Sequence, residues 1–187
     1  VMYCSAEIIS PGVIRHVEGT KFVIGEPSGE VSDRCRSIAK VFVTGGLKSS
    51  ATGDIREQIW LKLIGNVAFN PVSALTRSTL GEMAESQDLR LLLRRMMEEA
   101  VNVATALGVS LPLSIDKRLE GGLAVGDHKT SMLQDLEAGR PLELDCLTGA
   151  LAELAELLNV PVPYTRTIHA CTDMLGRHRV RQGGSHQ

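Results

Sequence analysis

The segment IWLKLIGNVAFNPVSAL, residues 59–75, constrains the fold more than any other part of the chain, because it is almost wholly apolar. The pattern predicts a helix that begins at Asp54, an N-cap with Glu57 three residues later, and that ends near Asn70. Pro71 should kink or break this helix, since proline removes a backbone hydrogen bond and disfavours α geometry in the preceding residue. So apolar a helix belongs in a core, and its polar residues need an explanation.

Lys62, Asn66 and Asn70 interrupt this segment at intervals of four residues. Each such step turns an α-helix by about 400°, so the three side chains share one face along roughly 12 Å. That face is either solvated surface or the lining of a cleft, and the spacing alone does not separate the two. Asparagine is a poor helix former for a plain wet face, whereas a cation with two amides suits a ligand with several oxygens. Gly65, also in mid-helix, favours a close backbone approach.

Residues 1–53 follow a different pattern from the rest of the chain. Apolar and polar residues alternate on both sides of Glu18-Gly19, which is a turn signal. The pattern predicts, in chain order, a β-hairpin (13–17 and 21–24), a short helix (32–39) and a buried strand (40–44) closed by two glycines. Strand–strand–helix–strand is too little for a stable sheet of its own, so we expect the remnant of a larger domain.

Residues 54–178 have the period of helices and predict an all-helical domain, and the basic, Gly-rich residues 179–187 predict a disordered tail with a solvated His186. Beyond the first helix, the predicted segments are a long helix (86–108), a short one (114–119), a Gly-rich loop, a short helix stopped by Gly139, an amphipathic helix (143–159) and a last helix (164–175).

Composition excludes several classes of function. A net charge of −2 and an aromatic content of 3% argue against binding to nucleic acid or to an anionic membrane. No apolar run is long and clean enough for a membrane span. The four cysteines are scattered without a C-x-x-C pair, which predicts free thiols and no metal site. Since the sequence starts at Val1 without a methionine, we expect a piece of a longer protein.

Ser131 and Glu143 each have an ordinary structural interpretation. Ser131 stands at a loop-to-helix junction, where serine is a common N-cap. Glu143 stands at the start of a predicted helix, where a carboxylate stabilises the helix dipole. Neither role excludes a binding site, because helix N-termini attract anionic ligands.

Taken together, these segments resemble the ketopantoate reductase (2-dehydropantoate 2-reductase) family. REQIWLKLIGNVAFNPVSALT resembles the first helix of that family's helical domain, and HKTSMLQDLEAGRPLELDCLTGALAELAELLNVPVPYTRTI resembles its C-terminal signature. GVIRHVEGTKFVIGE resembles the late strands of its nucleotide-binding domain. The resemblance implies a mainly α fold, a helical bundle of the 6-phosphogluconate-dehydrogenase C-terminal-like type, preceded by a short α/β remnant of a Rossmann domain.

The resemblance also implies an activity, the NADPH-dependent reduction of ketopantoate to pantoate in pantothenate and coenzyme A biosynthesis. Lys62 matches the family's catalytic lysine, a general acid for the ketone oxygen, and Asn66 and Asn70 match asparagines that contact the substrate. Ser131 matches a serine that contacts the substrate, and Glu143 matches a glutamate near the cofactor ribose and the active site. An ammonium group beside an oxygen that gains negative charge suits this chemistry.

The sequence departs from the family in one respect, because no G-x-G-x-x-G follows a strand. The missing nucleotide-binding domain is thus an implied partner, and we expect the chain alone to be inactive. Two alternatives stay open. In the first, the protein is a related dehydrogenase for another 2-keto or 3-hydroxy acid, since such enzymes share the K-x-x-x-N pair, and in either case we expect a cytoplasmic location. Otherwise it is a non-catalytic helical module that forms a homodimer through exposed apolar surface.

Overall fold

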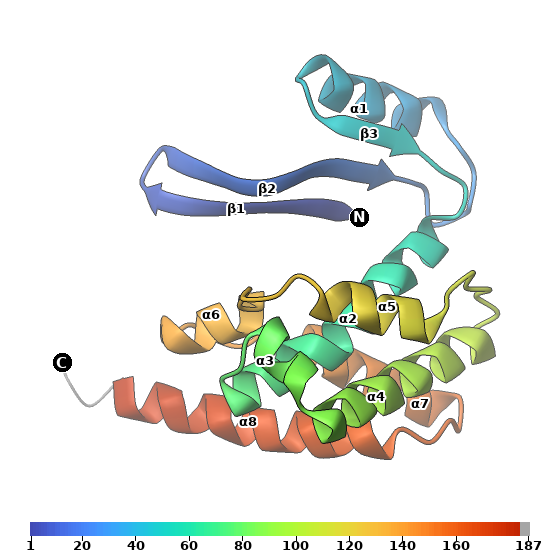
Figure 1. Ribbon diagram of the computed structural model, residues 1–187. Coiled ribbons are helices and arrows are strands. Elements are labelled where there is room, and N and C mark those ends of the chain that lie inside the picture. Colours follow the sequence, from blue (N-terminus) through green and yellow to red (C-terminus); the bar gives the residue numbers. More distant parts are fainter. Residues whose placement is uncertain (184–187) are drawn as a thin grey trace. The chain divides into compact units, whose positions relative to one another are not determined.

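The computed structural model describes the backbone of residues 1–183 and the side chains through residue 178. The chain forms two compact units, Val1–Lys62 and a second that begins at Leu63. Helix α2 (Ile55–Thr76) contributes residues to both units (Figure 1). The predicted mainly α architecture, with a small α/β portion at the start, is confirmed.

The N-terminal unit is built on a three-stranded sheet in the order β1-β2-β3. Its elements are β1 (Met2–Ser10), β2 (Val13–Ile24), α1 (Asp33–Thr44) and β3 (Lys48–Ala51). Strands β1 and β2 are antiparallel, and β3 runs parallel to β2. A parallel pair needs a crossover connection, which α1 supplies. The rings of Phe22 in β2 and Phe42 in α1 stack with centroids 4.7 Å apart and so tie the helix to the sheet.

The hairpin turn does not lie where the sequence pattern predicted it. Strand β2 runs unbroken through Glu18-Gly19, and the chain reverses at Pro11-Gly12 instead. Proline followed by a glycine at positive φ, here 81° for Gly12, is the pattern of a type II turn. Gly19 is at positive φ as well, 73°, and lies so close to the carbonyl of Tyr3 that a side chain would collide with it. It marks an irregularity in the β1–β2 pairing rather than a turn.

The predicted strand at residues 40–44 is also wrong, because these residues form the second half of α1. The helix ends in a Schellman motif with Gly46 at a φ of 87°, so the glycines close a helix rather than a strand. Val41 and Val43, the β-branched residues that favoured a strand, are exposed, while Phe42 between them faces the sheet. The β-branched residues at 41 and 43 therefore lie on the exposed side of a helix and not in a buried strand.

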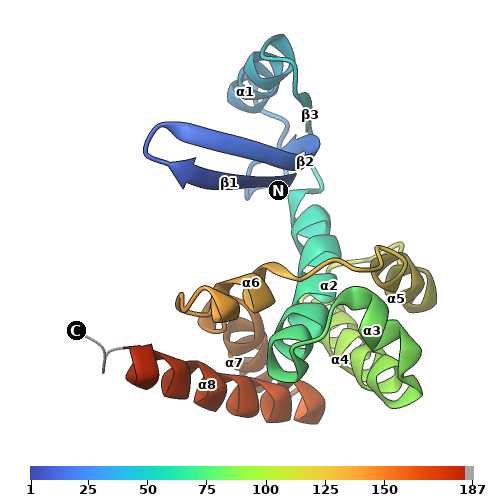
Figure 2. The same ribbon diagram turned by 60° about the vertical axis from the view of Figure 1, so that its left-hand side comes forward.

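The second unit is all-helical and centres on α4, which packs against α3, α5, α7 and α8 (Figures 1 and 2). Its further elements are α3 (Leu80–Glu85), α4 (Gln87–Ala106), α5 (Ile115–Leu123), α6 (Ser131–Glu137), the π-helical turn η1 (Asp145–Gly149), α7 (Ala150–Leu157) and α8 (Pro163–Gly183). Helix α8 continues through part of the expected disordered tail, and residues 184–187, with His186, lie outside the described residues. No helix among the described residues is long and apolar enough to cross a bilayer.

The prediction that α2 ends near Asn70 is wrong, because the helix continues to Thr76 with Pro71 inside it. An internal proline costs about 3 kcal/mol, because it leaves a carbonyl without its donor and crowds the preceding turn. The residues that follow offset this cost by packing, since residues 72–74 are at most 1% exposed. Tertiary contacts thus extend the helix past the point where local propensity would end it.

Two further helices differ from their predictions. Helix α5 continues through Gly121-Gly122, which the sequence had assigned to a loop. The predicted helix at 143–159 starts later, with the wide turn η1, and only then becomes the regular helix α7. All four cysteines are free thiols, as the sequence predicted.

A buried carboxylate anchors the start of α8. Glu99 on α4 is 6% exposed. Its side chain accepts hydrogen bonds from Tyr164 N at 2.9 Å, Thr165 N at 2.8 Å and Thr165 Oγ1 at 2.7 Å. The first backbone N–H groups of a helix have no partner within it, so Glu99 satisfies two of them from another helix.

Replacing Glu99 should therefore destabilise the helical unit. We expect Glu99→Ala to lower the free energy of unfolding by about 2–3 kcal/mol, because buried donors lose a charged acceptor. Urea denaturation followed by circular dichroism would measure the loss. Glu98→Gln is the matched control, since among the described residues Glu98 pairs only with the surface residues Arg94 and Arg95, and it should change stability by less than about 0.5 kcal/mol. Equal effects of both changes would contradict this role of Glu99.

In the N-terminal unit, Glu26 joins the end of β2 to the start of α1. Arg34 donates to both its carboxylate oxygens, at 2.5 and 3.1 Å, and Ser32 Oγ donates at 2.6 Å. These hydrogen bonds, from Arg34 first and Ser32 second, lower the pKa of Glu26 to about 2. Ser32 also caps α1 by accepting from Cys35 N at 3.1 Å, so the same cluster sets the start of the helix.

The lowered pKa makes the contribution of Glu26 depend on pH. Because the folded pKa of about 2 is below the ordinary 4.5, this contribution is complete at neutral pH and is lost as the pH falls from 4.5 towards 2. We expect Arg34→Met to raise the pKa of Glu26 in an NMR carboxyl titration. Arg36→Met, which removes a partner of Asp33 instead, should leave it unchanged. A Glu26 pKa that is the same in both variants would show that Arg34 is not its cause.

Candidate functional site

The polar stripe of α2 becomes more buried along the helix. Lys62 and Asn66 are partly exposed, whereas Asn70 is only 8% exposed. A solvated face would stay exposed along its length, so the far end of the stripe is not ordinary surface. A buried amide needs hydrogen-bond partners, and its contacts therefore show what this end of the stripe faces.

Asn70 contacts Ser131, the first residue of α6, so the fold brings together two of the residues that the resemblance proposed for substrate binding. Asn70 Nδ2 lies 3.5 Å from Ser131 Oγ, a long hydrogen bond. The N-cap of α6 is not Ser131 but Thr130, whose hydroxyl accepts from Leu133 N at 3.2 Å. The structural role that the sequence offered for Ser131 is thus taken by its neighbour, and the exposed Ser131 hydroxyl is free of capping.

Lys62 is the last residue of the N-terminal unit, and its ammonium group is held there by β1. Nζ donates to Met2 O at 2.6 Å and lies 5.8 Å from the centroid of the Tyr3 ring. Within the described residues no carboxylate pairs with this ammonium. A carbonyl and an aromatic face orient the lysine without neutralising its charge, so the charge stays available to an anionic or polarised oxygen.

Glu143 is exposed and lies in the loop before η1, not at the first turn of a helix. Its predicted interaction with a helix dipole is therefore wrong in detail, since the regular helix α7 begins only at Ala150. Among the described contacts, no hydrogen bond joins Glu143 to Asn70 or Ser131. The structure thus brings together Asn70 and Ser131, and leaves the role of Glu143 as a prediction.

Sequence reasoning missed one charged residue that packs against α2, Arg118 of α5. Gly65 of α2 has no side chain, and a Cβ built on it would overlap the Arg118 guanidinium. What approaches this glycine is a side chain, not the backbone that the sequence suggested. Arg118 Nε is buried and makes no hydrogen bond, and an unpaired buried donor costs about 1–3 kcal/mol. Only the packing of α5 near α2 reveals this residue, so its sequence position carried no signal.

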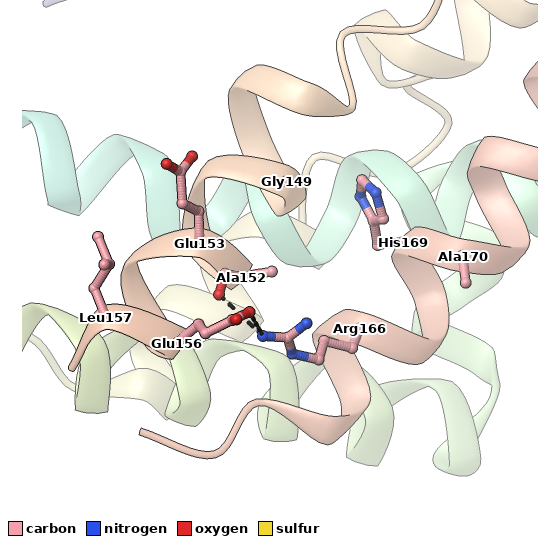
Figure 3. Close-up of a pocket in the computed structure, with 8 residues that line it drawn as sticks. All are labelled: Gly149, Ala152, Glu153, Glu156, Leu157, Arg166, His169 and Ala170. Carbon is pink, nitrogen blue, oxygen red and sulfur yellow. Dashed lines mark hydrogen bonds and ion pairs between the residues drawn. The ribbon is translucent and has the colours of Figure 1, made fainter. Parts of the chain in front are cut away.

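A surface groove of about 560 Å³ lies elsewhere on the helical unit, between α7 and α8 (Figure 3). An ion pair between Arg166 and Glu156 at 2.8 Å crosses one side of it. His169 is held there through Nδ1, 2.8 Å from the buried Thr148 Oγ1. None of the predicted site residues lines this groove, so its size does not make it the site that the sequence indicated.

Comparison with protein families gives one extended match. The model described as "Ketopantoate reductase PanE/ApbA C terminal" matches residues 54–175, from the residue before α2 into α8. The matched range contains every residue that the sequence proposed for the site, Lys62, Asn66, Asn70, Ser131 and Glu143. The family match therefore covers the helix that carries the stripe and most of the helical unit.

Individual relatives agree with this match. A 2-dehydropantoate 2-reductase of Mesorhizobium japonicum is 48% identical over 183 residues, which are 98% of this chain and 55% of that protein. One of Halobacterium salinarum is 35% identical over 159 residues, 84% of this chain and 52% of that protein. The crystal structure of 2-dehydropantoate 2-reductase from Methylococcus capsulatus superposes with a TM-score of 0.87 at 30% identity, covering 95% of this chain and 62% of that one. The chain thus spans about half the length of the curated relatives it matches.

Proposed function

The chain belongs to the ketopantoate reductase family, and from that premise we propose that it is the substrate-binding part of an NADPH-dependent 2-dehydropantoate 2-reductase. The observation that carries this proposal is the contact of Asn70 with Ser131 at the buried end of the stripe on α2. Two residues far apart in sequence, each matched to a substrate contact, meet in the helical unit. Lys62 and Asn66 precede Asn70 by two turns and one turn of the same helix.

The proposed roles follow from the chemistry of a ketone. When its carbon gains a hydride, the carbonyl oxygen gains negative charge and then a proton to become a hydroxyl. Lys62 supplies a positive charge for that oxygen and the proton that it takes up. Asn66, Asn70 and Ser131 offer neutral donors and acceptors, which suit the oxygens of a hydroxylated 2-keto acid and fix its orientation. Glu143 we assign to the cofactor ribose and the active site.

The residues of this chain do not by themselves fit the dinucleotide that the family implies. A pyrophosphate is held where glycines leave the first strand-to-helix turn open to it. Gly25 lies in the connection from β2 to α1. A Cβ on it would meet the Ile55 side chain and Thr52 O, so protein atoms already fill the space where a phosphate would have to lie. No G-x-G-x-x-G occurs among the 187 residues. The proposed chemistry is therefore limited to what this chain does to the substrate.

Several features of the proposal remain predictions. These are the choice of NADPH over NADH, the completion of the site by a nucleotide-binding domain, a cytoplasmic location and self-association as a homodimer. The alternative of another 2-keto or 3-hydroxy acid as substrate is decided by assay, because Lys62 and Asn66 suit any such ketone.

Full-length protein with Lys62→Met should retain substrate binding but lose turnover. We expect kcat for ketopantoate to fall by roughly 10²–10⁴-fold, the usual loss when a general acid is removed. Initial rates of NADPH oxidation over a range of ketopantoate concentrations would measure kcat and KM separately. Lys40→Met, which changes an exposed lysine on α1, is the matched control and should keep the activity.

Two results would contradict this proposal in different ways. If the unmodified full-length protein reduces another 2-keto acid and not ketopantoate, the substrate is wrong but the role of Lys62 stands. If it reduces ketopantoate and Lys62→Met does so equally well, the polar stripe is structural and the general acid lies elsewhere.

A further inference from the structure

Lys62 meets strand β1 at the edge that faces away from β2. Val1 and Val23 exchange backbone hydrogen bonds, Val23 N to Val1 O at 2.8 Å and Val1 N to Val23 O at 2.6 Å. In an antiparallel pair such bonded pairs alternate with unbonded ones, so Met2, opposite Phe22, turns its carbonyl away from β2. Lys62 Nζ donates to that carbonyl at 2.6 Å. The strand thus gives the lysine an acceptor that β2 does not use.

The next residue, Tyr3, brings its ring to the same ammonium group. Lys62 Nζ lies 5.8 Å from the ring centroid, and Lys21 Nζ lies 5.5 Å from it. Lys21 stands directly opposite Tyr3 on β2, and such a pair shares one face of a sheet. The electron-rich face of an aromatic ring attracts cations. Tyr3 is therefore held by its neighbour across the strands and at the same time contacts Lys62.

This contact restricts the lysine without using its donors. The side chain of lysine is a flexible four-carbon stem, and its ammonium group has three N–H donors. Met2 O accepts from one of them. The ring of Tyr3 attracts the charge as a whole, so the remaining donors stay available to a ligand.

We propose that Tyr3 is a positioning residue for Lys62, and that Lys21 acts on Lys62 only through the ring of Tyr3. This inference rests on the function proposed above, in which Lys62 protonates the ketone oxygen. A general acid works only when it is held within hydrogen-bonding reach of its acceptor. Without the ring, Lys62 is chemically intact but its ammonium group occupies more positions. The loss therefore falls on kcat and not on KM.

The test compares three side chains at position 3 in full-length protein. Tyr3→Phe keeps the aromatic face, and Tyr3→Leu keeps an apolar side chain without it. We expect Tyr3→Leu to lower kcat for ketopantoate by roughly 2- to 5-fold, the change that corresponds to an exposed cation–π contact, with KM nearly unchanged. Tyr3→Phe should keep the kcat of the unmodified protein. Tyr164→Leu, at the other tyrosine of the chain, exposed on α8, is the matched control and should also keep it.

Double variants separate positioning from a merely structural role. In Lys62→Met the ring has no ammonium group to hold, so adding Tyr3→Leu should leave the residual kcat unchanged. A further fall there would show that Tyr3 only supports the fold, and would overturn its proposed role. Lys21→Met should lower kcat by no more than Tyr3→Leu does. If it lowers kcat again in the Tyr3→Leu background, Lys21 does not act through the ring.

An NMR measurement tests the contact without turnover. The ring current of Tyr3 should shift the Cε protons of Lys62 upfield in the unmodified protein and in Tyr3→Phe, but not in Tyr3→Leu. No turnover of any 2-keto acid by the unmodified full-length protein would overturn the proposed function, and the role of Tyr3 with it. Normal turnover with the same kcat in all three proteins, or a Lys62 signal that Tyr3→Leu does not move, would overturn the role of Tyr3 alone.

Discussion

The burial of helix α2 is the constraint on which the rest of the helical unit depends. Ile64, Val67 and Ala68 are fully buried, and the packing continues past Pro71 with Ser73 and Ala74 equally buried. A helix that is apolar on nearly all sides needs other helices around it, and Figures 1 and 2 show α2 among them in this unit. Every polar residue on such a helix has to be bonded or has to face an opening.

The polar residues of α2 meet this requirement in different ways. Ser73 donates to Ser78 O at 2.6 Å and so fixes the turn that follows the helix. Within the part of the chain that the structure describes, the Asn70 side chain has only the long hydrogen bond to Ser131. Gly65, which has no side chain, leaves room beside the helix for the Arg118 guanidinium of α5. The first arrangement is complete within the protein. The other two leave hydrogen-bonding capacity unused, which is typical of a surface that a ligand completes.

Local signals in the sequence predicted the helices well and the connections poorly. Helix α4 begins beside the N-cap Ser86, as expected, because a cap and its apolar face lie within a few residues. The hairpin turn depended on register instead. Pro11-Gly12 and Glu18-Gly19 are both turn signals, and only the pairing of β1 with β2 shows which one reverses the chain. Pro71 was misjudged because the packing that outweighs it comes from distant segments.

The candidate site shows the same difference between what local sequence signals predict and what tertiary packing decides. Asn70 and Ser131 were proposed from the sequence, and only the fold shows that they are in contact. The assignment of Ser131 as a cap failed because Thr130, one residue earlier, does that work. The sequence did not reveal Arg118, because its position depends on tertiary packing. Gly65 leaves room for its guanidinium, and Gly122 leaves room for Phe69, between α2 and α5. Residues that act through tertiary packing have no local pattern by which a sequence reveals them.

The weakness of the Asn70–Ser131 contact bears on how a substrate would enter. At 3.5 Å this hydrogen bond lies at the limit of useful geometry, so breaking it costs little. Thr130 already caps α6, and Ser131 can therefore turn its hydroxyl to a ligand without loosening the helix. A substrate oxygen placed between the amide and the hydroxyl would give each a shorter partner than it has now. In the proposed site, such a substrate would therefore lose little binding energy by breaking their mutual contact.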